Sequence, residues 1–136
     1  MPGVQQLRDK FEQEYVLGVS QIDQIHHEFV DLLAETLNSA GDDFKRMFQR
    51  LWEHTQLHFF EEEARMAAFS FAGQDAHKAD HDRILKKMEE LSALVAAGDH
   101  ATALDWLASD LPDWFDKHTR TMDGAAVARV LQCEAS

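Results

Sequence analysis

Cysteine and proline are scarce in this sequence, and each scarcity excludes a class of protein. A single cysteine, Cys133, among 136 residues cannot form an internal disulfide, so a disulfide-stapled secreted fold is excluded. As a metal ligand it is also a poor candidate, because no second thiol accompanies it. Two prolines and six glycines are too few for a turn-rich β fold. The composition therefore favours an all-α protein in a reducing compartment.

Positive charge is scarce as well. The chain has 13 Lys and Arg against 25 Asp and Glu, a net charge of −12, which repels nucleic-acid phosphates and anionic lipid headgroups. No apolar run approaches the roughly 20 residues that span a bilayer, and residues 1–10 lack the features of a signal peptide. We expect a cytoplasmic protein that binds neither nucleic acid nor membrane, and no protein partner is indicated.

The length predicts one domain over residues 1–136, and the apolar residues divide it into helices. Apolar spacings of three and four predict helices over 20–39, from 42 or 43 to about 66, and 74–97. A fourth, over 99–122, contains Pro112, so a break is expected near Asp110. Residues 1–18 are interpreted as an irregular arm and residues 124–136 as a tail, helical to about 131. Helices of similar length with short connections predict an up-down-up-down antiparallel four-helix bundle over 19–123.

Five of the eight histidines fall on the apolar stripes that should face inward. His58 and Glu62 are four residues apart, and so are His77 and His81, so each pair projects from one face of its helix. The first and fourth helices add His26 and His118. The other histidines, His27, His54 and His100, are interpreted as exposed or boundary residues, and Glu61 and Glu63 as mostly solvated.

Asp123 lies five residues after His118, which is the least regular spacing in the set. At about 100° per residue, this spacing places the two side chains about 140° apart, so they converge only if the helix distorts or ends between them. Gly124 favours an ending. With Asp123 the set has five imidazoles and two carboxylates, too many for one tetrahedral zinc but about the number that two octahedral-leaning ions need. Iron, manganese and zinc all accept such ligands.

The motifs of this set resemble those of the hemerythrin family, specifically the single-domain bacterial hemerythrins. The matching segments, which together cover about residues 15–125, are GVSQIDQIH at 18–26, HFFEEE at 58–63 with Met66, the HxxxH pair at 77–81, and WFDKH at 114–118 with Asp123. The resemblance implies two Fe ions, one bound by His26 and His58 and the other by His77, His81 and His118. It also implies that Glu62, Asp123 and an oxo or hydroxo group bridge them.

The same resemblance implies reversible O₂ binding for storage, delivery or sensing, without catalysis, at a position left open on the ion with two imidazoles. Apolar neighbours of the irons would exclude water, and those expected are Ile25, Phe29, Phe59 and Trp114. Ile25 stands where the family usually has Gln, and Arg65 where it usually has Leu. Thr119 replaces a common Ile near the O₂ pocket, and its hydroxyl is expected to reach a bound ligand and speed autoxidation.

Two other functions stay open from the sequence. A di-iron oxidase, peroxidase or nitric-oxide-handling enzyme is the main alternative, but ferritin-like enzymes use two Glu-x-x-His motifs, which this chain lacks in the right places. An iron buffer or structural metal site is the third hypothesis, and it predicts no O₂-dependent spectrum.

Overall fold

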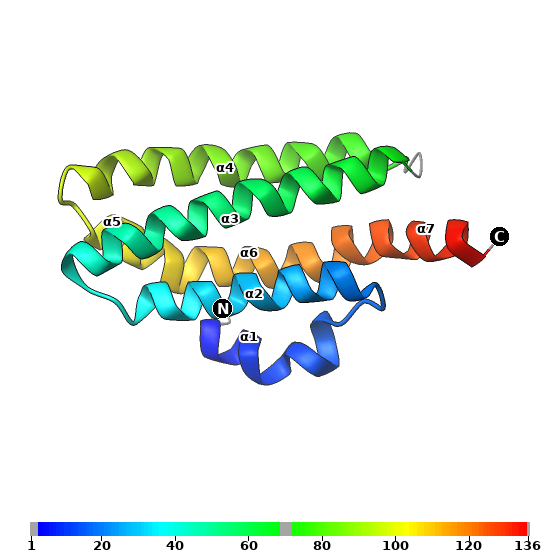
Figure 1. The fold of residues 1–136 in the computed structure, drawn as a ribbon, viewed down its shortest axis with the longest axis horizontal. Helices are drawn as coiled ribbons and strands as arrows, with labels where there is room; N and C mark the ends of the chain where they lie inside the picture. The colour runs from blue at the N-terminus through cyan, green and yellow to red at the C-terminus, as the bar shows by residue number, and fades with distance from the viewer. Residues whose placement is uncertain (1–2, 69–71, 136) are drawn as a thin grey trace.

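The computed structural model describes residues 3–68 and 72–135, and it contains helices and no strand within those ranges (Figure 1). Three long helices, α2 (Ser20–Leu37), α3 (Gly41–Ala68) and α4 (Gln74–Ala96), run antiparallel to one another in chain order. A fourth rod returns beside α2. It joins five segments end to end: α5 (Ala101–Asp105), η2 (Trp106–Asp110), α6 (Leu111–His118), η3 (Thr119–Asp123) and α7 (Gly124–Ala135). The predicted all-α, up-down-up-down bundle is confirmed.

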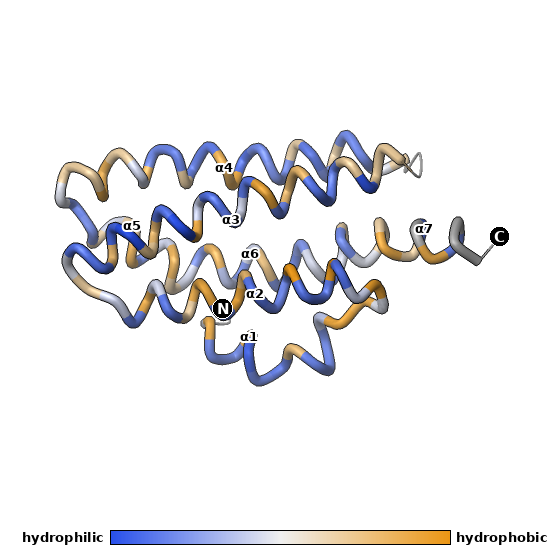
Figure 2. The backbone as a smooth tube through the Cα atoms, in the orientation of Figure 1, coloured by the Kyte–Doolittle hydropathy of each residue, from blue (hydrophilic) through white to orange (hydrophobic). Residues whose placement is uncertain are grey.

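The core forms where the apolar stripes of the helices meet. Figure 2 shows hydrophobic and hydrophilic residues alternating along the long helices. Leu33, Leu51, Met88 and Leu107 are completely buried, one from each rod of the bundle. Each such side chain contributes about 1.5–3 kcal/mol on burial. Because polar faces interrupt every stripe, no helix among the described residues is apolar enough over a sufficient length to cross a membrane.

The irregular arm predicted for residues 1–18 is wrong over most of its described length. Residues Val4–Lys10 form α1, and Phe11–Tyr15 form a π-helical turn, η1. Leu7, Phe11 and Tyr15 are four residues apart, so one face of this short helix is apolar, and all three side chains are buried in the core. Burial of this apolar face therefore stabilises a helix that would be too short to be stable alone.

The break predicted near Asp110 is also wrong. Asp105, Asp110 and Leu111 all have helical backbone angles, and Pro112 is the second residue of α6. The π-helical turn η2 directly precedes it. A proline clashes with the carbonyl four residues before it and cannot donate to that carbonyl. The wider turn, with hydrogen bonds to the fifth residue back, moves that carbonyl away from the ring. The rod therefore continues through the proline.

The helix does not end at Gly124 either. Gly124 has helical backbone angles, φ −58° and ψ −44°, and the chain passes from η3 directly into α7. The expected tail is therefore, over residues 124–135, the last part of the fourth rod, which projects beyond the neighbouring helices in Figure 1, while position 136 lies outside the described residues. The side chain of Cys133, on this segment, lies outside the described part of the structure.

Candidate metal centre

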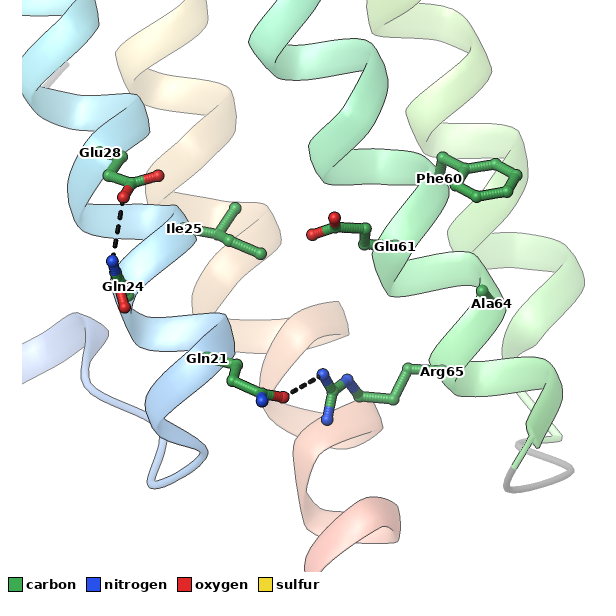
Figure 3. A pocket seen from close by; sticks show the side chains of 8 residues that line it. All are labelled: Gln21, Gln24, Ile25, Glu28, Phe60, Glu61, Ala64 and Arg65. Carbon is green, nitrogen blue, oxygen red and sulfur yellow. Dashed lines mark hydrogen bonds between the residues drawn. The ribbon is translucent and has the colours of Figure 1, made fainter.

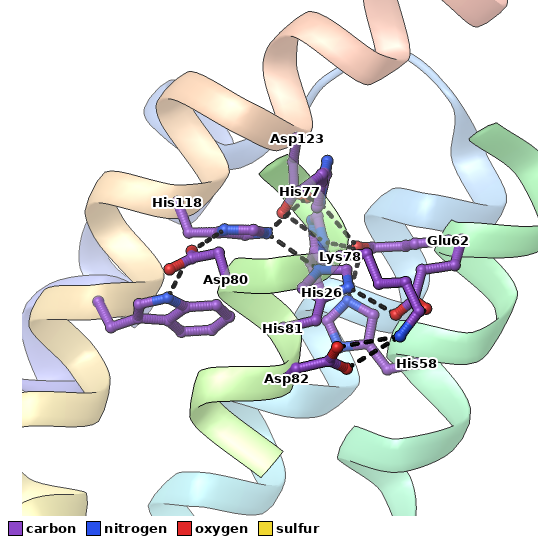
Figure 4. A network of polar contacts seen from close by, with 12 residues as sticks. His26, His58, Glu62, His77, Lys78, Asp80, His81, Asp82, His118 and Asp123 are labelled. Carbon is purple, nitrogen blue, oxygen red and sulfur yellow. Dashed lines mark hydrogen bonds and ion pairs between the residues drawn. The ribbon is translucent and has the colours of Figure 1, made fainter. Parts of the chain in front are cut away.

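Seven side chains from all four rods of the bundle converge in its interior (Figure 4). They are the seven that the sequence analysis selects: His26, His58, Glu62, His77, His81, His118 and Asp123. Each is at most 7% exposed. Their potential ligand atoms form two groups in which all atoms lie within 4.8 Å of one another. His26, His58 and Glu62 make one group, while Glu62 also joins the other four residues in the second.

Glu62 is the residue that joins the two groups. Its Oε1 lies 2.8 Å from Nε2 of His26 and 2.6 Å from Nε2 of His58. Its second oxygen, Oε2, lies 3.2 Å from Nε2 of His81 and 3.6 Å from Nε2 of His77. The carboxylate thus presents one oxygen to each group, as a bridging ligand would.

Asp123 occupies an equivalent position at the end of η3. Its Oδ1 lies 2.8 Å from Nε2 of His77 and 3.0 Å from Nε2 of His118, and its Oδ2 lies 3.2 Å from Nε2 of His26. The π-helical turn Thr119–Asp123 makes this possible, because an i to i+5 pattern places residues five apart on nearly the same face. The spacing from His118 to Asp123 is therefore resolved by distortion of the helix.

The outer nitrogens of two imidazoles are held by carboxylates that the sequence analysis missed. Nδ1 of His81 lies 3.0 Å from Oε2 of Glu63, and Nδ1 of His118 lies 2.7 Å from Oδ2 of Asp80. Glu63, interpreted from sequence as mostly solvated, is therefore half-buried against the cluster. Asp80 lies three residues after His77, beside the inward stripe, and no periodicity marks it.

Aromatic rings form the walls of the cluster. The ring of Phe59 stacks on His81 with centroids 3.8 Å apart, and Trp114 stacks on His118 at 4.5 Å. Phe29 lies 6.0 Å from His58. Thr119 is fully buried, and its hydroxyl oxygen has no hydrogen-bond partner. These four predicted neighbours are all inside the bundle.

Ile25, the fifth predicted neighbour, lies differently. It is half-buried and lines a groove of about 660 Å³ between α2 and α3, with Glu28, Glu61 and Phe60 (Figure 3). Arg65 closes one end of the groove by donating a hydrogen bond of 2.7 Å to Gln21. Ile25 is therefore part of an outer wall, one helical face away from its neighbour His26.

The remaining histidines lie outside the cluster. His27 is exposed and pairs with Asp31 at 3.1 Å. His54 lies one turn before His58 and is 3.5 Å from Oε2 of Glu28. His100 is half-buried, with its ring 4.9 Å from that of Phe44. Proximity in sequence therefore does not bring a histidine into the site unless it lies on an inward face.

The charges of the cluster are strongly coupled. Burial alone would lower the pKa of a histidine, but the carboxylates of Asp123 and Glu62 outweigh it, raising the pKa of His26 to about 10 and that of His77 to about 9. For His58 burial dominates, and the pKa is lowered. Burial would raise the pKa of Glu62 and Asp123, yet the surrounding imidazoles hold both well below the usual range. Two ionised carboxylates therefore sit inside the bundle.

Some polar atoms of the cluster point at common positions without a hydrogen-bond partner. Nε2 of His77 and Oδ1 of Asp123 lie 2.8 Å apart, yet neither has a partner in hydrogen-bonding geometry, and Oε2 of Glu62 also lacks one. Unpaired buried groups of this kind are costly, at about 1–3 kcal/mol each or more when charged. Coordination removes that cost, so these residues fit a buried metal site.

Comparisons with known proteins agree with this geometry. The family described as "Hemerythrin HHE cation binding domain" matches residues 17–130. The chain is 34% identical over 107 residues to a bacteriohemerythrin of Ralstonia nicotianae, covering 79% of this chain and 77% of that relative. It is 37% identical over 90 residues to a hemerythrin subunit of Sipunculus nudus, covering 65% of this chain and 69% of that relative.

The fold is shared as well. A crystal structure of wild-type hemerythrin superposes with a TM-score of 0.75 at 23% identity, covering 82% of this chain and 88% of that chain. The family match spans most of the sequence and includes all seven residues of the cluster. This chain therefore belongs to the hemerythrin family.

Proposed function

We propose that the cluster holds two iron ions and that the protein binds O₂ reversibly. His77, His81 and His118 would hold one ion, and His26 and His58 the other, with Glu62 and Asp123 bridging them. The half with two imidazoles offers fewer protein ligands and would therefore leave the more open position for a small ligand. Bound iron would supply the electrons that O₂ chemistry requires, and both the similarity to hemerythrins and the donor set support this assignment.

The donor set of five imidazoles and two carboxylates is the observation that carries the proposal, and the space beside it limits the size of a ligand. A cavity of only about 10 Å³ reaches Glu62, His77 and Asp123, and its other walls include the side chains of Ile22, Met66, Ala126 and Val127. This is about the space that one water molecule occupies. The cavity borders His77 and the two carboxylates, not His26 or His58, and it is far too small for an organic substrate.

The buried aromatic rings would protect the site from bulk water. Phe29 stacks on Phe115 with centroids 5.3 Å apart, and Phe115 lies 5.6 Å from His26. Phe59 and Trp114 cover the opposite half by stacking on His81 and His118. Excluding water slows the proton-coupled loss of a reduced oxygen ligand, which is what reversible binding requires.

A nitric-oxide-handling enzyme is the second candidate, because nitric oxide also fits a cavity of this size. An oxidase or peroxidase that acts on organic molecules would have to bind its substrate elsewhere than in this cavity. The two small-ligand functions differ in what happens after binding, since a carrier releases its ligand unchanged and an enzyme consumes it.

Reconstitution with ferrous iron tests the proposal. The metal-free protein is loaded with Fe²⁺ without oxygen, exposed to air, and then returned to an oxygen-free atmosphere while its visible spectrum is recorded. Two irons per chain and a band that appears with O₂ and disappears on its removal are expected. Immediate irreversible oxidation contradicts the carrier function, and turnover of nitric oxide by the ferrous protein would favour the enzyme.

A matched pair of variants on α3 controls this experiment. His58→Ala removes a proposed ligand and should abolish the O₂-dependent band. His54→Ala removes the histidine one turn earlier, which lies outside the cluster, and should leave the band intact.

A further inference from the structure

Two imidazoles of the cluster face each other through their inner nitrogen atoms. Nε2 of His81 and Nε2 of His118 lie 3.1 Å apart. The opposite nitrogen of each ring, Nδ1, lies against a carboxylate, Glu63 for His81 and Asp80 for His118. A carboxylate accepts hydrogen bonds, so Glu63 and Asp80 favour the tautomer in which the N–H of each neutral ring is on Nδ1. In that tautomer the lone pairs of both Nε2 atoms are directed at one point.

This arrangement is unfavourable without a cation. In that tautomer two acceptor nitrogens lie 3.1 Å apart and repel each other, and the nearby oxygens, Oε2 of Glu62 and Oδ1 of Asp123, are acceptors too. A metal ion coordinated by these atoms turns the repulsion into binding energy. Carboxylates that hold the outer N–H of metal-binding histidines are known to fix ring orientation and tautomer.

Asp80, the carboxylate beside His118, is itself held in place. Oδ2 of Asp80 also accepts a hydrogen bond of 2.8 Å from the indole N–H of Trp114, and Arg83 donates to its Oδ1 at 3.0 Å. The Trp114 ring that donates to Asp80 also stacks on His118, with an interplanar angle of 23°. The orientation of His118 is therefore set from two sides, by its hydrogen bond and by its stacking partner.

In the two-imidazole half, no carboxylate supports the outer nitrogens of the rings. Nδ1 of His26 and Nδ1 of His58 are buried without a hydrogen-bond partner, so neither ring of this half is held, whereas in the three-imidazole half only His77 lacks such a partner. The inner nitrogens of both rings approach the same oxygen, Oε1 of Glu62. No group among the described residues accepts a hydrogen bond from the outer nitrogen of His26 or His58, so no such contact fixes the tautomer of these two rings.

We propose that Asp80 and Glu63 are positioning residues that preorganise the three-imidazole half, so that it takes up a metal ion before the two-imidazole half and holds it more tightly. The two metal ions of the centre are therefore loaded in a fixed order. This inference rests on the two-metal centre proposed above, but it concerns metal binding alone and does not depend on O₂ chemistry.

Titration of the metal-free protein with Co²⁺ tests the order of loading, because the visible spectrum of Co²⁺ reports its ligands. We expect two resolved steps in the wild-type protein. His118→Gln should remove the first, tighter step, whereas His58→Gln should keep the first step and lose the second. Far-ultraviolet circular dichroism of each metal-free variant checks that the bundle is folded.

Variants of the two positioning carboxylates test their role directly. Asp80→Asn and Glu63→Gln should each weaken the first step by about 10- to 100-fold and leave the second within a few-fold of the wild type. Asp82→Asn and Glu61→Gln are the matched controls, since both remove an exposed carboxylate from the same helices. Both controls should titrate like the wild type.

The outcomes separate this inference from the proposed function. If the wild type binds no Co²⁺ in the cluster, the metal centre itself is refuted. If it binds two ions, but His118→Gln keeps the tight step or Asp80→Asn matches Asp82→Asn, the centre stands and ordered loading is wrong. Equal weakening of both steps by Asp80→Asn would indicate a general structural role and would also overturn the inference.

Discussion

The phenol of Tyr15 donates a hydrogen bond of 2.5 Å to Oδ1 of Asp116, and this contact joins the N-terminal arm to α6 across 101 positions of sequence. The Tyr15 ring also lies 5.5 Å from the ring of Phe115, which in turn lies 5.6 Å from His26. The arm is therefore one aromatic ring away from the cluster. It supports the wall behind the two-imidazole half, where no carboxylate holds the outer nitrogens of the histidines.

Tyr15→Phe should destabilise the protein without disturbing its core. The substitution keeps the buried ring and removes one hydrogen bond to a charged acceptor, for which a loss of about 1.5–3 kcal/mol is expected. Urea unfolding of the metal-free protein measures the loss. Glu12→Gln, an exposed change on the same turn, is the control. In combination with Asp116→Asn the effects should be less than additive, and full additivity would mean that the hydrogen bond does not couple the two residues.

The ionisation of Tyr15 should be displaced to high pH. Burial, together with the hydrogen bond to Asp116, raises the pKa of this phenol above its ordinary value. A raised pKa in the folded state gives stability that is complete below the unfolded value of about 10 and is lost as the pH rises through the folded value. Tyr15 is the only tyrosine of the chain, so phenolate absorbance reports it alone. Ionisation near pH 10 in the folded protein would contradict the prediction.

Most residues of the cluster could be predicted from the sequence because they follow regular helical spacing. His58 with Glu62, and His77 with His81, are four apart on stripes that are otherwise apolar, so their inward direction follows from the helix alone. Asp80 and Glu63 could not be found in this way. Each lies beside an inward stripe, and its role depends on its distance to an imidazole on a different helix. The periodicity of one helix does not encode that distance.

The departures from the predicted fold have a common physical origin. Pro112 and the spacing from His118 to Asp123 are both incompatible with a regular α-helix, and from the sequence each predicts a break or a distortion. The chain uses π-helical turns, η2 and η3, which keep the rod continuous while changing its register. Such turns have no strong local sequence signal, because tertiary packing and the geometry of the site select them.

Metal loading should release protons and should be favoured by higher pH. His26 and His77 have raised pKa values of about 10 and about 9 in the metal-free protein, so both hold a proton at neutral pH. A metal ion needs the neutral imidazole and must displace these protons. Lowering the pH should therefore weaken binding. Loading Zn²⁺ in a weakly buffered solution with a pH indicator should show about two protons released per chain near pH 7, and no release would contradict the prediction.

Thr119→Val should stabilise the metal-free protein or leave its stability unchanged, and should also prolong the oxygenated state. Thr119 is fully buried, and its hydroxyl has no partner, a condition that costs about 1–3 kcal/mol. Valine has nearly the same shape and removes that hydroxyl, so the free energy of unfolding measured in urea should not fall.

The same substitution separates a packing role from a chemical one. If the Thr119 hydroxyl reaches a bound oxygen ligand or its water, removing it should slow autoxidation, measured as the decay of the O₂-dependent band. Thr119→Ser keeps the hydroxyl but loses the methyl group, so it should retain fast autoxidation while lowering stability by the cost of a small cavity, about 1 kcal/mol. Equal decay rates in the valine and serine variants would show that the hydroxyl takes no part in the chemistry. Parallel changes in stability and decay rate would assign the effect to packing.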